Sequence, residues 1–361
     1  MKNLRSALGA GRQRLIRRLR TGTALERSIY YTFVSDAFRR ERKVVARGHR
    51  KYLVDVEAGR HEFLIRRNIH MIEKGLTMRP RRVTFAVEYI EETVALATSL
   101  VKLSPTPLSP AVLAWVHEVL ERYFAATVQS ENSRIRRAEK AYRAIEWTEA
   151  PDGVSGPTTP QTDDPSVGIE DLTALAVRRK SVRWFLDRPV PREVVDKAML
   201  VAAEAPSACN RQPFSFRVFD EPAMVEAVAR IPMGTAGYGQ GLRGIVVIVG
   251  DLSAFIDERD RHLIYTDGCL AAMSFILGLE AQGVASVCIN WPDIAQRDQR
   301  MNDLLGLTEH ERVVMLMGYG YADRTGHTPH SAKRSLENLR TFNVMNETSA
   351  LFSTSTRGAS Q

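Results

Sequence analysis

The segments Arg178-Arg-Lys-Ser-Val-Arg-Trp-Phe185 and Ala205-Pro-Ser-Ala-Cys-Asn-Arg-Gln-Pro-Phe214 decide the interpretation of this chain. In the first, Arg179, Ser181 and Arg183 alternate, so an extended backbone would point all three side chains the same way. Two guanidinium groups and a hydroxyl on one side make a good anion site. Taken alone, the first segment is explained as well by a cationic helix C-terminus, and the second by a simple helix-to-strand loop.

Together, in this order and about 25 residues apart, the two segments resemble the nitroreductase family of FMN enzymes. Three later features agree with that resemblance. Residues 266–283 look like the family's long central helix, and residues 284–290 look like the strand beside the flavin. Residues 318–321, followed by Lys333-Arg334, look like the closing strand and its basic phosphate-binding segment. The resemblance covers residues 170 to about 342.

The resemblance implies a site for the phosphate of FMN. This dianion needs fixed cations and hydrogen-bond donors. By family position, Arg179 and either Lys333 or Arg334 bind the phosphate, and Ser181 hydrogen-bonds nearby. Lys180, at the second position of the first motif, is a further cation and joins this cofactor-binding set.

The resemblance also implies how the flavin ring is held. Arg183 is expected beside N1/O2, where a cation stabilises the reduced flavin and tunes its potential. The backbone of Cys288, Ile289 and Asn290 is placed to supply an N–H to N5, the atom that accepts and donates hydride. Gln240 is the candidate for the pyrimidine ring. No residue set predicts a metal site.

Pro206, Ser207 and Ala208 match the loop that, in this family, packs against the flavin of the partner subunit. We therefore expect a homodimer with the flavin site at the subunit interface. Asn210 matches the same cofactor-binding motif, and with Gln212 it is expected to hold the loop together. Cys209 and Cys288 are interpreted as small buried side chains rather than catalytic thiols.

The function implied is an FMN-dependent NAD(P)H oxidoreductase. NAD(P)H reduces the flavin and leaves, and a small electron-poor acceptor, nitroaromatic- or quinone-like, takes its place. No G-x-G-x-x-G string follows a predicted strand and opens a predicted helix, as expected if the nicotinamide docks directly on the flavin. Two alternatives stay open: oxidation of a peptide, lipid-linked or glycan-linked substrate, and a redox-inactive flavin fold whose basic helical half binds a membrane surface or an acidic partner.

The N-terminal half carries its own resemblance. The segment Ile65-Arg-Arg-Asn-Ile-His-Met-Ile-Glu-Lys-Gly-Leu76 is similar to a helical extension found in a bacterial subgroup of nitroreductase-like proteins, often linked to surface-polysaccharide gene sets. Its His70 and Glu73 are three residues apart on a predicted helix, but two ligands do not make a metal site, so we interpret them as structural.

Charge is concentrated at the N-terminus. Residues 1–51 hold fifteen Lys/Arg and three Asp/Glu, a balance of +12, so the remainder carries −4 of the net +8. Apolar residues among the arginines form a narrow stripe that could lie on an anionic membrane surface or pack as a solvated helix. No nucleic-acid recognition motif accompanies the basic residues. We therefore expect peripheral membrane contact, if any, through residues 1–50.

Composition and the cysteines bound the remaining possibilities. The chain has 361 residues, 44% hydrophobic and 25% charged, which suits two soluble domains. No apolar run reaches the length of a membrane span, and no secretory signal follows the basic start. The three cysteines have no CxxC spacing, which argues against a disulfide framework or a zinc site. We expect a protein of the cytoplasm.

Periodicity and turn residues predict an α+β fold: an all-helical region over 1–150 with a basic arm, a linker over 151–168, an FMN domain with a central mixed or antiparallel sheet flanked by helices over 169–343, and a polar tail over 344–361. Helices are predicted at 1–50, 61–73, 83–103, 110–128, 134–147, 169–178, 192–204, 222–230, 266–282 and 294–305. Strands are predicted at 214–219, 245–249, 286–290 and 313–317.

Overall fold

The computed structural model describes residues 13–147, 156–158 and 165–344. Most of the predicted linker and nearly all of the predicted tail therefore lie outside the described residues. The chain divides into two compact units, Met1–Gly326 and His327–Gln361. In the second unit, the described part contains one short 3-10 turn, η6 (Leu336–Asn338).

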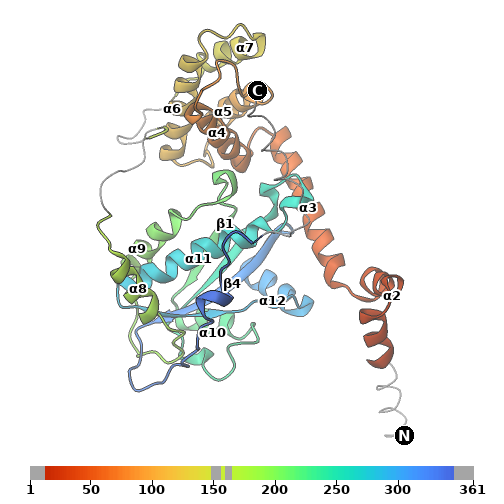
Figure 1. The fold of residues 1–361 in the computed structure, drawn as a ribbon, viewed down its shortest axis with the longest axis vertical. Helices are drawn as coiled ribbons and strands as arrows, with labels where there is room; N and C mark the ends of the chain where they lie inside the picture. Colours follow the sequence, from red (N-terminus) through yellow and green to blue (C-terminus); the bar gives the residue numbers. More distant parts are fainter. Residues whose placement is uncertain (1–12, 148–155, 159–164, 345–361) are drawn as a thin grey trace, which may run out of the picture. The chain divides into compact units, whose positions relative to one another are not determined.

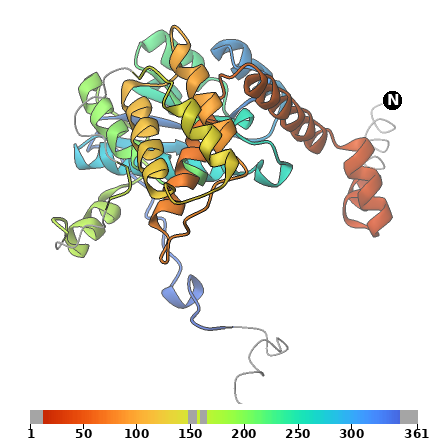
Figure 2. The ribbon, with the colours of Figure 1, turned by 90° about the horizontal axis from the view of Figure 1, so that it is seen from above.

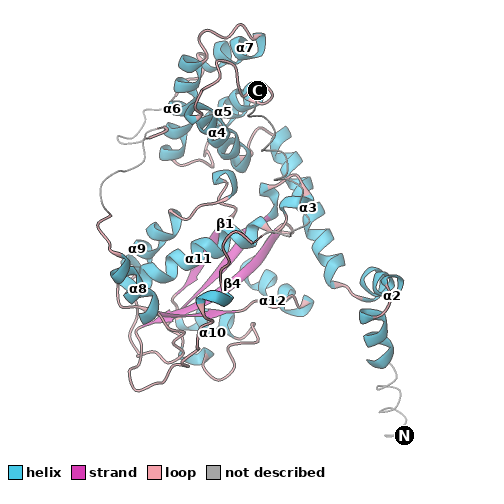
Figure 3. Cartoon of the chain, in the orientation of Figure 1, coloured by secondary structure: helices cyan, strands magenta, loops and turns pink. Residues whose placement is uncertain are grey.

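The first unit contains the predicted sheet (Figures 1 and 3). Its strands are β1 (Phe214–Phe219), β2 (Gly244–Asp251), β3 (Ala285–Ile289) and β4 (Glu311–Gly320), in the spatial order β1-β2-β4-β3. Each neighbouring pair is antiparallel. All four strand predictions are confirmed, with β2 and β4 longer than expected.

Helices cover both faces of this sheet. On β2, Val246 and Ile248 pack against α9 (Arg192–Ala203) and α11 (Leu263–Ala281). The alternate residues Ile245, Val247 and Val249 share a core with α10 (Pro222–Ala229) and α12 (Ala295–Leu305). A strand buried on both faces must be apolar at every position, which explains the unbroken run in β2.

Helix α11 lies beside α9 in Figure 1 and is the central helix predicted from the sequence. The two pack closely, since a Cβ added at Gly278 would lie 2.9 Å from Ala198 Cα. Within the described residues, one stretch, Glu258–Ala281, is long and apolar enough for a membrane span by length and composition, and half of its apolar window is buried in the protein. Its packing on the sheet is that of a core helix.

The helices of the N-terminal half build a separate core. They are α4 (Glu62–Thr77), α5 (Ile90–Lys102), α6 (Pro110–Ala126) and α7 (Ser133–Tyr142). Fully buried side chains such as Ile65, Ile69 and Leu120 form that core. The prediction of a helix over 83–103 was wrong at its start: Ala86 has a φ of 59°, and α5 begins only after this turn.

Residues 13–57 are helical but interrupted. A helix over 13–21 is followed by α2 (Ala24–Ile29), a π-helical turn η1 (Tyr30–Val34) and the long helix α3 (Ala37–Glu57), visible in Figure 2. The middle of α3 contacts the sheet domain, because Val44 and Val45 pack with Leu252 and Phe255. Helix α8 (Ile169–Arg178) leads into the first motif.

Candidate functional site

The first motif lies along the edge of β3. Ser181 forms a parallel bridge with Ser286, and Val182 N–H donates to Ser286 O at 3.0 Å. Phe185 then forms an antiparallel bridge with Ala322. The segment is therefore extended, and its polar side chains are held beside the edge strand.

Three cations of this segment are available to an anion. Arg178 pairs with the buried Glu280 at 2.8 Å, whereas Arg179, Lys180 and Arg183 form no ion pair with any described residue. All three are half-buried. Unpaired cations concentrated within five residues repel one another, so binding an anion here relieves an unfavourable charge arrangement.

Arg183 lies against a glycine-rich segment. Its guanidinium carbon is 5.7 Å from the ring centroid of Tyr238, and its Nη1 donates to Ser181 O at 3.4 Å. Tyr238 and Gln240 line a cavity of about 480 Å³ together with Trp184. Burial raises the pKa of Tyr238, and the nearby Arg183 opposes that change. Gln240 therefore lies two residues after Tyr238, whose ring Arg183 contacts.

The second motif is a strained and tightly bonded loop. Cys209, Asn210 and Gln212 have φ values of 53°, 52° and 53°, in the left-handed region that costs non-glycine residues free energy. Gln212 N–H donates to Ser207 Oγ at 3.1 Å, and Gln212 Nε2 donates to Asn210 Oδ1 at 3.1 Å. As expected, Asn210 and Gln212 hold the loop together, while Pro206 stays exposed.

Two residues that sequence reasoning missed anchor this loop. Asp267 of α11 is buried and accepts the Ala208 N–H at 3.0 Å. Burial raises the pKa of Asp267, and the bond to Ala208 opposes that shift. The buried Arg211 donates to Ala208 O at 3.2 Å and lies over the Phe255 ring. A carboxylate inside an apolar helix was the signal that could have drawn attention to Asp267.

The segment expected at flavin N5 ends strand β3. Ile289 is buried, and Cys288 and Asn290 are exposed. The interpretation of Cys288 as a buried side chain was wrong. Cys288 lies between the buried Val287 and Ile289 on an edge strand, so its side chain points to the opposite face of the sheet from theirs. Neighbouring atoms still desolvate the Cys288 thiol and raise its pKa. Cys209 is only half-buried, which also departs from the interpretation.

The remaining predicted site residues belong to other parts of the chain. Lys333 and Arg334 belong to the second unit, where Arg334 donates to Asn338 O at 2.6 Å, and their phosphate role stays a prediction. Glu73 accepts a hydrogen bond from Trp115 Nε1 at 2.9 Å within the helical core, a structural contact. Among the described residues, no group of three or more His, Cys, Asp or Glu is arranged to hold a metal ion.

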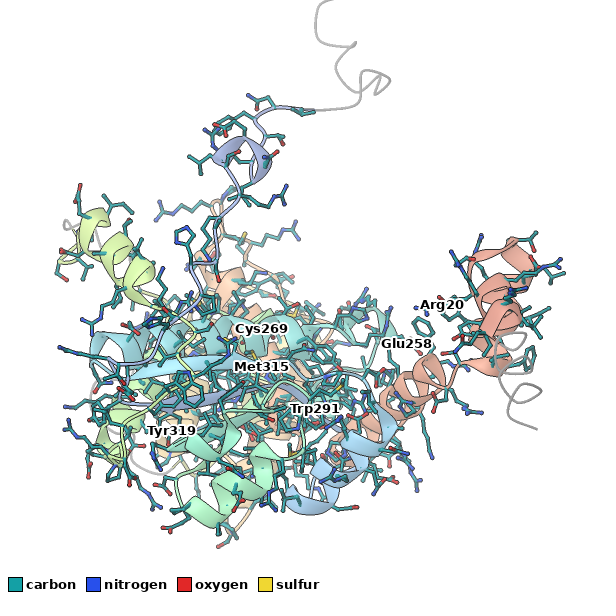
Figure 4. The ribbon with its side chains drawn as sticks, turned by 90° about the horizontal axis from the view of Figure 1, so that it is seen from below. Arg20, Glu258, Cys269, Trp291, Met315 and Tyr319 are labelled. Carbon is teal, nitrogen blue, oxygen red and sulfur yellow. The ribbon has the colours of Figure 1, made fainter. Side chains whose placement is uncertain are left out.

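A second cavity, of about 530 Å³, adjoins the end of β3 and was not foreseen. Trp291, two residues past β3 and labelled in Figure 4, lines it with Tyr265 and Arg312. Helix α3 contributes Glu41, which accepts from Arg261 at 3.3 Å. These residues come from four separate segments, so no sequence motif marks them.

Comparison with known proteins agrees with this geometry. Residues 176–236 and 242–321, which contain both motifs and the whole sheet, match the model of the nitroreductase family. These residues, less than half of the chain, form a domain that matches the nitroreductase family, and the match supports a flavin oxidoreductase in general.

Individual relatives are distant from this chain. An NADH dehydrogenase of Thermus thermophilus is 26% identical over 193 residues, covering 45% of this chain and 92% of the relative. Iodotyrosine deiodinase 1 of Pongo abelii is 21% identical over 254 residues, covering 62% of this chain and 84% of the relative. An FMN-dependent nitroreductase structure from Clostridium difficile is 20% identical with a TM-score of 0.41, covering 48% of this chain and 99% of that one.

Proposed function

We propose that this protein is an FMN-dependent oxidoreductase that transfers hydride from NAD(P)H to a small electron-poor acceptor of the nitroaromatic or quinone class. The observation that carries the proposal is the set of three unpaired cations, Arg179, Lys180 and Arg183, held beside the edge of β3 by the Ser181–Ser286 bridge. The residues present fit FMN, because its phosphate dianion and its ring N1/O2 both need cations. When bound, FMN supplies hydride chemistry at N5.

Each residue would have a distinct task toward that group. Arg179, Lys180 and Ser181 would bind the phosphate, and the resemblance adds Lys333 or Arg334 to the same role. Arg183, oriented by Tyr238, would place its positive charge beside the pyrimidine ring with Gln240. The backbone around Asn290, an exposed residue that directly follows β3, would donate an N–H toward N5.

The site would be completed by a second copy. Pro206, Ser207 and Ala208 form a loop already rigidified by internal hydrogen bonds, which suits packing against a partner's cofactor. Helix α11 also exposes apolar side chains on its outer face: Leu270 and Met273 are each 43% exposed, and Tyr265 is 38% exposed. Such a stripe supports a homodimer. The proposed compartment is the cytoplasm.

The decisive experiment is an absorbance spectrum of the purified protein before and after NADPH or NADH. The proposal predicts a yellow protein whose flavin band is bleached by a reduced nicotinamide and restored by menadione or a nitroaromatic. A colourless protein that takes up no FMN would refute it. A flavin that neither nicotinamide reduces would refute the direction of electron flow.

A matched pair of variants tests the placement of Arg183. Arg183→Ala should weaken FMN binding by about ten- to a hundredfold, because a charge-assisted hydrogen bond contributes roughly 1.5–3 kcal/mol. It should also lower the flavin potential. The control is Arg188→Ala, since Arg188 also lies on an aromatic ring, Tyr321 at 4.0 Å, but outside the motif. Equal FMN affinity and potential in both variants would show that the motif is misplaced.

A second candidate acceptor class follows from one observation. The match to iodotyrosine deiodinase extends over 254 residues, well beyond the family model's span. We therefore infer that a halogenated aromatic is a further candidate acceptor, with two electrons and a proton replacing the carbon–halogen bond by carbon–hydrogen and releasing halide. Halide release from 3-iodotyrosine by the NADPH-reduced protein tests this. No halide release while menadione is reduced would exclude it.

A further inference from the structure

An apolar surface without cover runs along the N-terminal helices. We call residues 13–43 the arm. Leu25, Ile29 and Phe33 recur at four-residue spacing on α2 and η1, and they are 72%, 40% and 79% exposed. Neither element has a buried residue. Buried apolar side chains that pack on the sheet domain begin only at Val44, beyond the arm, although Arg40 of the arm already pairs with Asp293.

Aromatic side chains continue this surface into α3. The Tyr30 and Tyr31 rings meet edge-to-face at 5.0 Å, and Tyr31 meets Phe38 at 5.3 Å. Phe38 is itself half exposed. Tyrosine has an apolar body and a polar tip, so it is suited to the boundary between water and hydrocarbon. The arm therefore presents a boundary-type surface rather than scattered apolar residues.

The same segment is strongly cationic. The arm holds nine Lys/Arg and three Asp/Glu, a net charge of +6. Arg18 pairs with Glu26, and Arg40 pairs with Asp36 and Asp293. The other basic residues of the arm form no ion pair with any described residue; they are Arg14, Arg17, Arg20 (labelled in Figure 4), Arg27, Arg39, Arg42 and Lys43.

We propose that the arm binds the surface of an anionic lipid bilayer, with Leu25, Ile29 and Phe33 entering the acyl boundary and the unpaired arginines contacting phosphate headgroups. The two kinds of group act together there: the apolar side chains are buried in the acyl boundary, and each basic residue near an anionic surface raises the partition coefficient about fivefold. A nucleic acid would use the charge but leave the apolar side chains in water. A second arm would bring two surfaces of like charge together.

Vesicle binding of the full-length protein tests this proposal. The protein should co-sediment with vesicles of phosphatidylcholine plus phosphatidylglycerol, bind pure phosphatidylcholine far less, and dissociate as salt is raised. Leu25→Ser and Phe33→Ser should each lower the partition coefficient about tenfold, since burying such a side chain contributes roughly 1.5–3 kcal/mol. Leu200→Ser, at a leucine of α9 that is 70% exposed, is the matched control and should leave binding unchanged.

Three results would overturn the proposal: no sedimentation with anionic vesicles, equal binding to neutral vesicles, or equal loss from Leu25→Ser and Leu200→Ser. Light scattering without vesicles tests the other possible occupant of this surface, a second copy of the chain. If Phe33→Ser converts a dimer to a monomer and leaves vesicle binding intact, the arm is an interface between copies of this chain. Circular dichroism of each variant checks that helix content is retained.

Discussion

Lowering the pH from 7.5 to 5.0 should destabilise this protein through one buried histidine. His61 precedes α4, is 2% exposed, and packs against Tyr52. Its Nδ1 accepts the Leu64 N–H at 3.0 Å, so its Nε2, 3.1 Å from Ser253 O, must carry the proton and donate. Both ring nitrogens are therefore committed in the neutral ring, and a second proton would break the cap of α4.

Burial lowers the pKa of His61 to about 4, with the charge of Asp55 opposing that shift. Because the folded pKa lies below the unfolded value of about 6.5, the unfolded chain binds the proton more readily. Stability is therefore full above about pH 6.5 and is lost as the pH falls toward 4. With these values, proton linkage removes about 2 kcal/mol at pH 5.0.

The assay is urea unfolding at pH 7.5 and 5.0 for the wild type and for His61→Asn. Asparagine can cap a helix but does not titrate, so His61→Asn keeps a capping residue before α4 and removes the titrating group. The free energy of unfolding of the wild type should fall by about 2 kcal/mol more than that of the variant over this range. If both fall equally, His61 does not carry the pH dependence and the reasoning is wrong.

Three further predictions concern the sheet domain. Gly278→Ala should cost about 1–3 kcal/mol of stability in urea unfolding, because its Cβ would press on Ala198, whereas Gly234→Ala meets nothing within 4 Å and should be near neutral. Asp267→Ala should cost about 1–3 kcal/mol by leaving the Ala208 N–H unsatisfied, and Asp267→Asn should recover most of it. Cys288 should react with N-ethylmaleimide faster as the pH rises, and FMN should protect it.

Each of these has a contradicting outcome. Equal stabilities of Gly278→Ala and Gly234→Ala would mean that α9 moves away at no cost. Equal losses in the alanine and asparagine variants of Asp267 would show that the hydrogen bond to Ala208 is not what matters there. Labelling of Cys288 that FMN does not slow, at a concentration that saturates the protein, would separate this residue from the cofactor site.

Much of the fold could be predicted from the sequence because local rules were sufficient. Strand β2 is buried on both faces over residues 244–250, none of which has a polar side chain, and β1 and α8 have the predicted bounds without change. The alternating pattern of 179–183 fits the extended form that the structure shows, although the pattern alone fitted a helix C-terminus as well. Where a local rule failed, as at Ala86, a left-handed turn interrupted an apolar pattern that continued through it.

The sequence by itself predicted which residues could hold an anionic cofactor, since two motifs with a fixed order and spacing carry the resemblance on which that prediction rests. Only the tertiary structure decided which cations are free. Arg178 and Arg179 are neighbours in the chain, yet Glu280 on α11 neutralises only the first. Likewise, the structure alone brings Asp267 to the loop and Glu41 to the second cavity, because contacts between distant segments depend on packing, which no local pattern records.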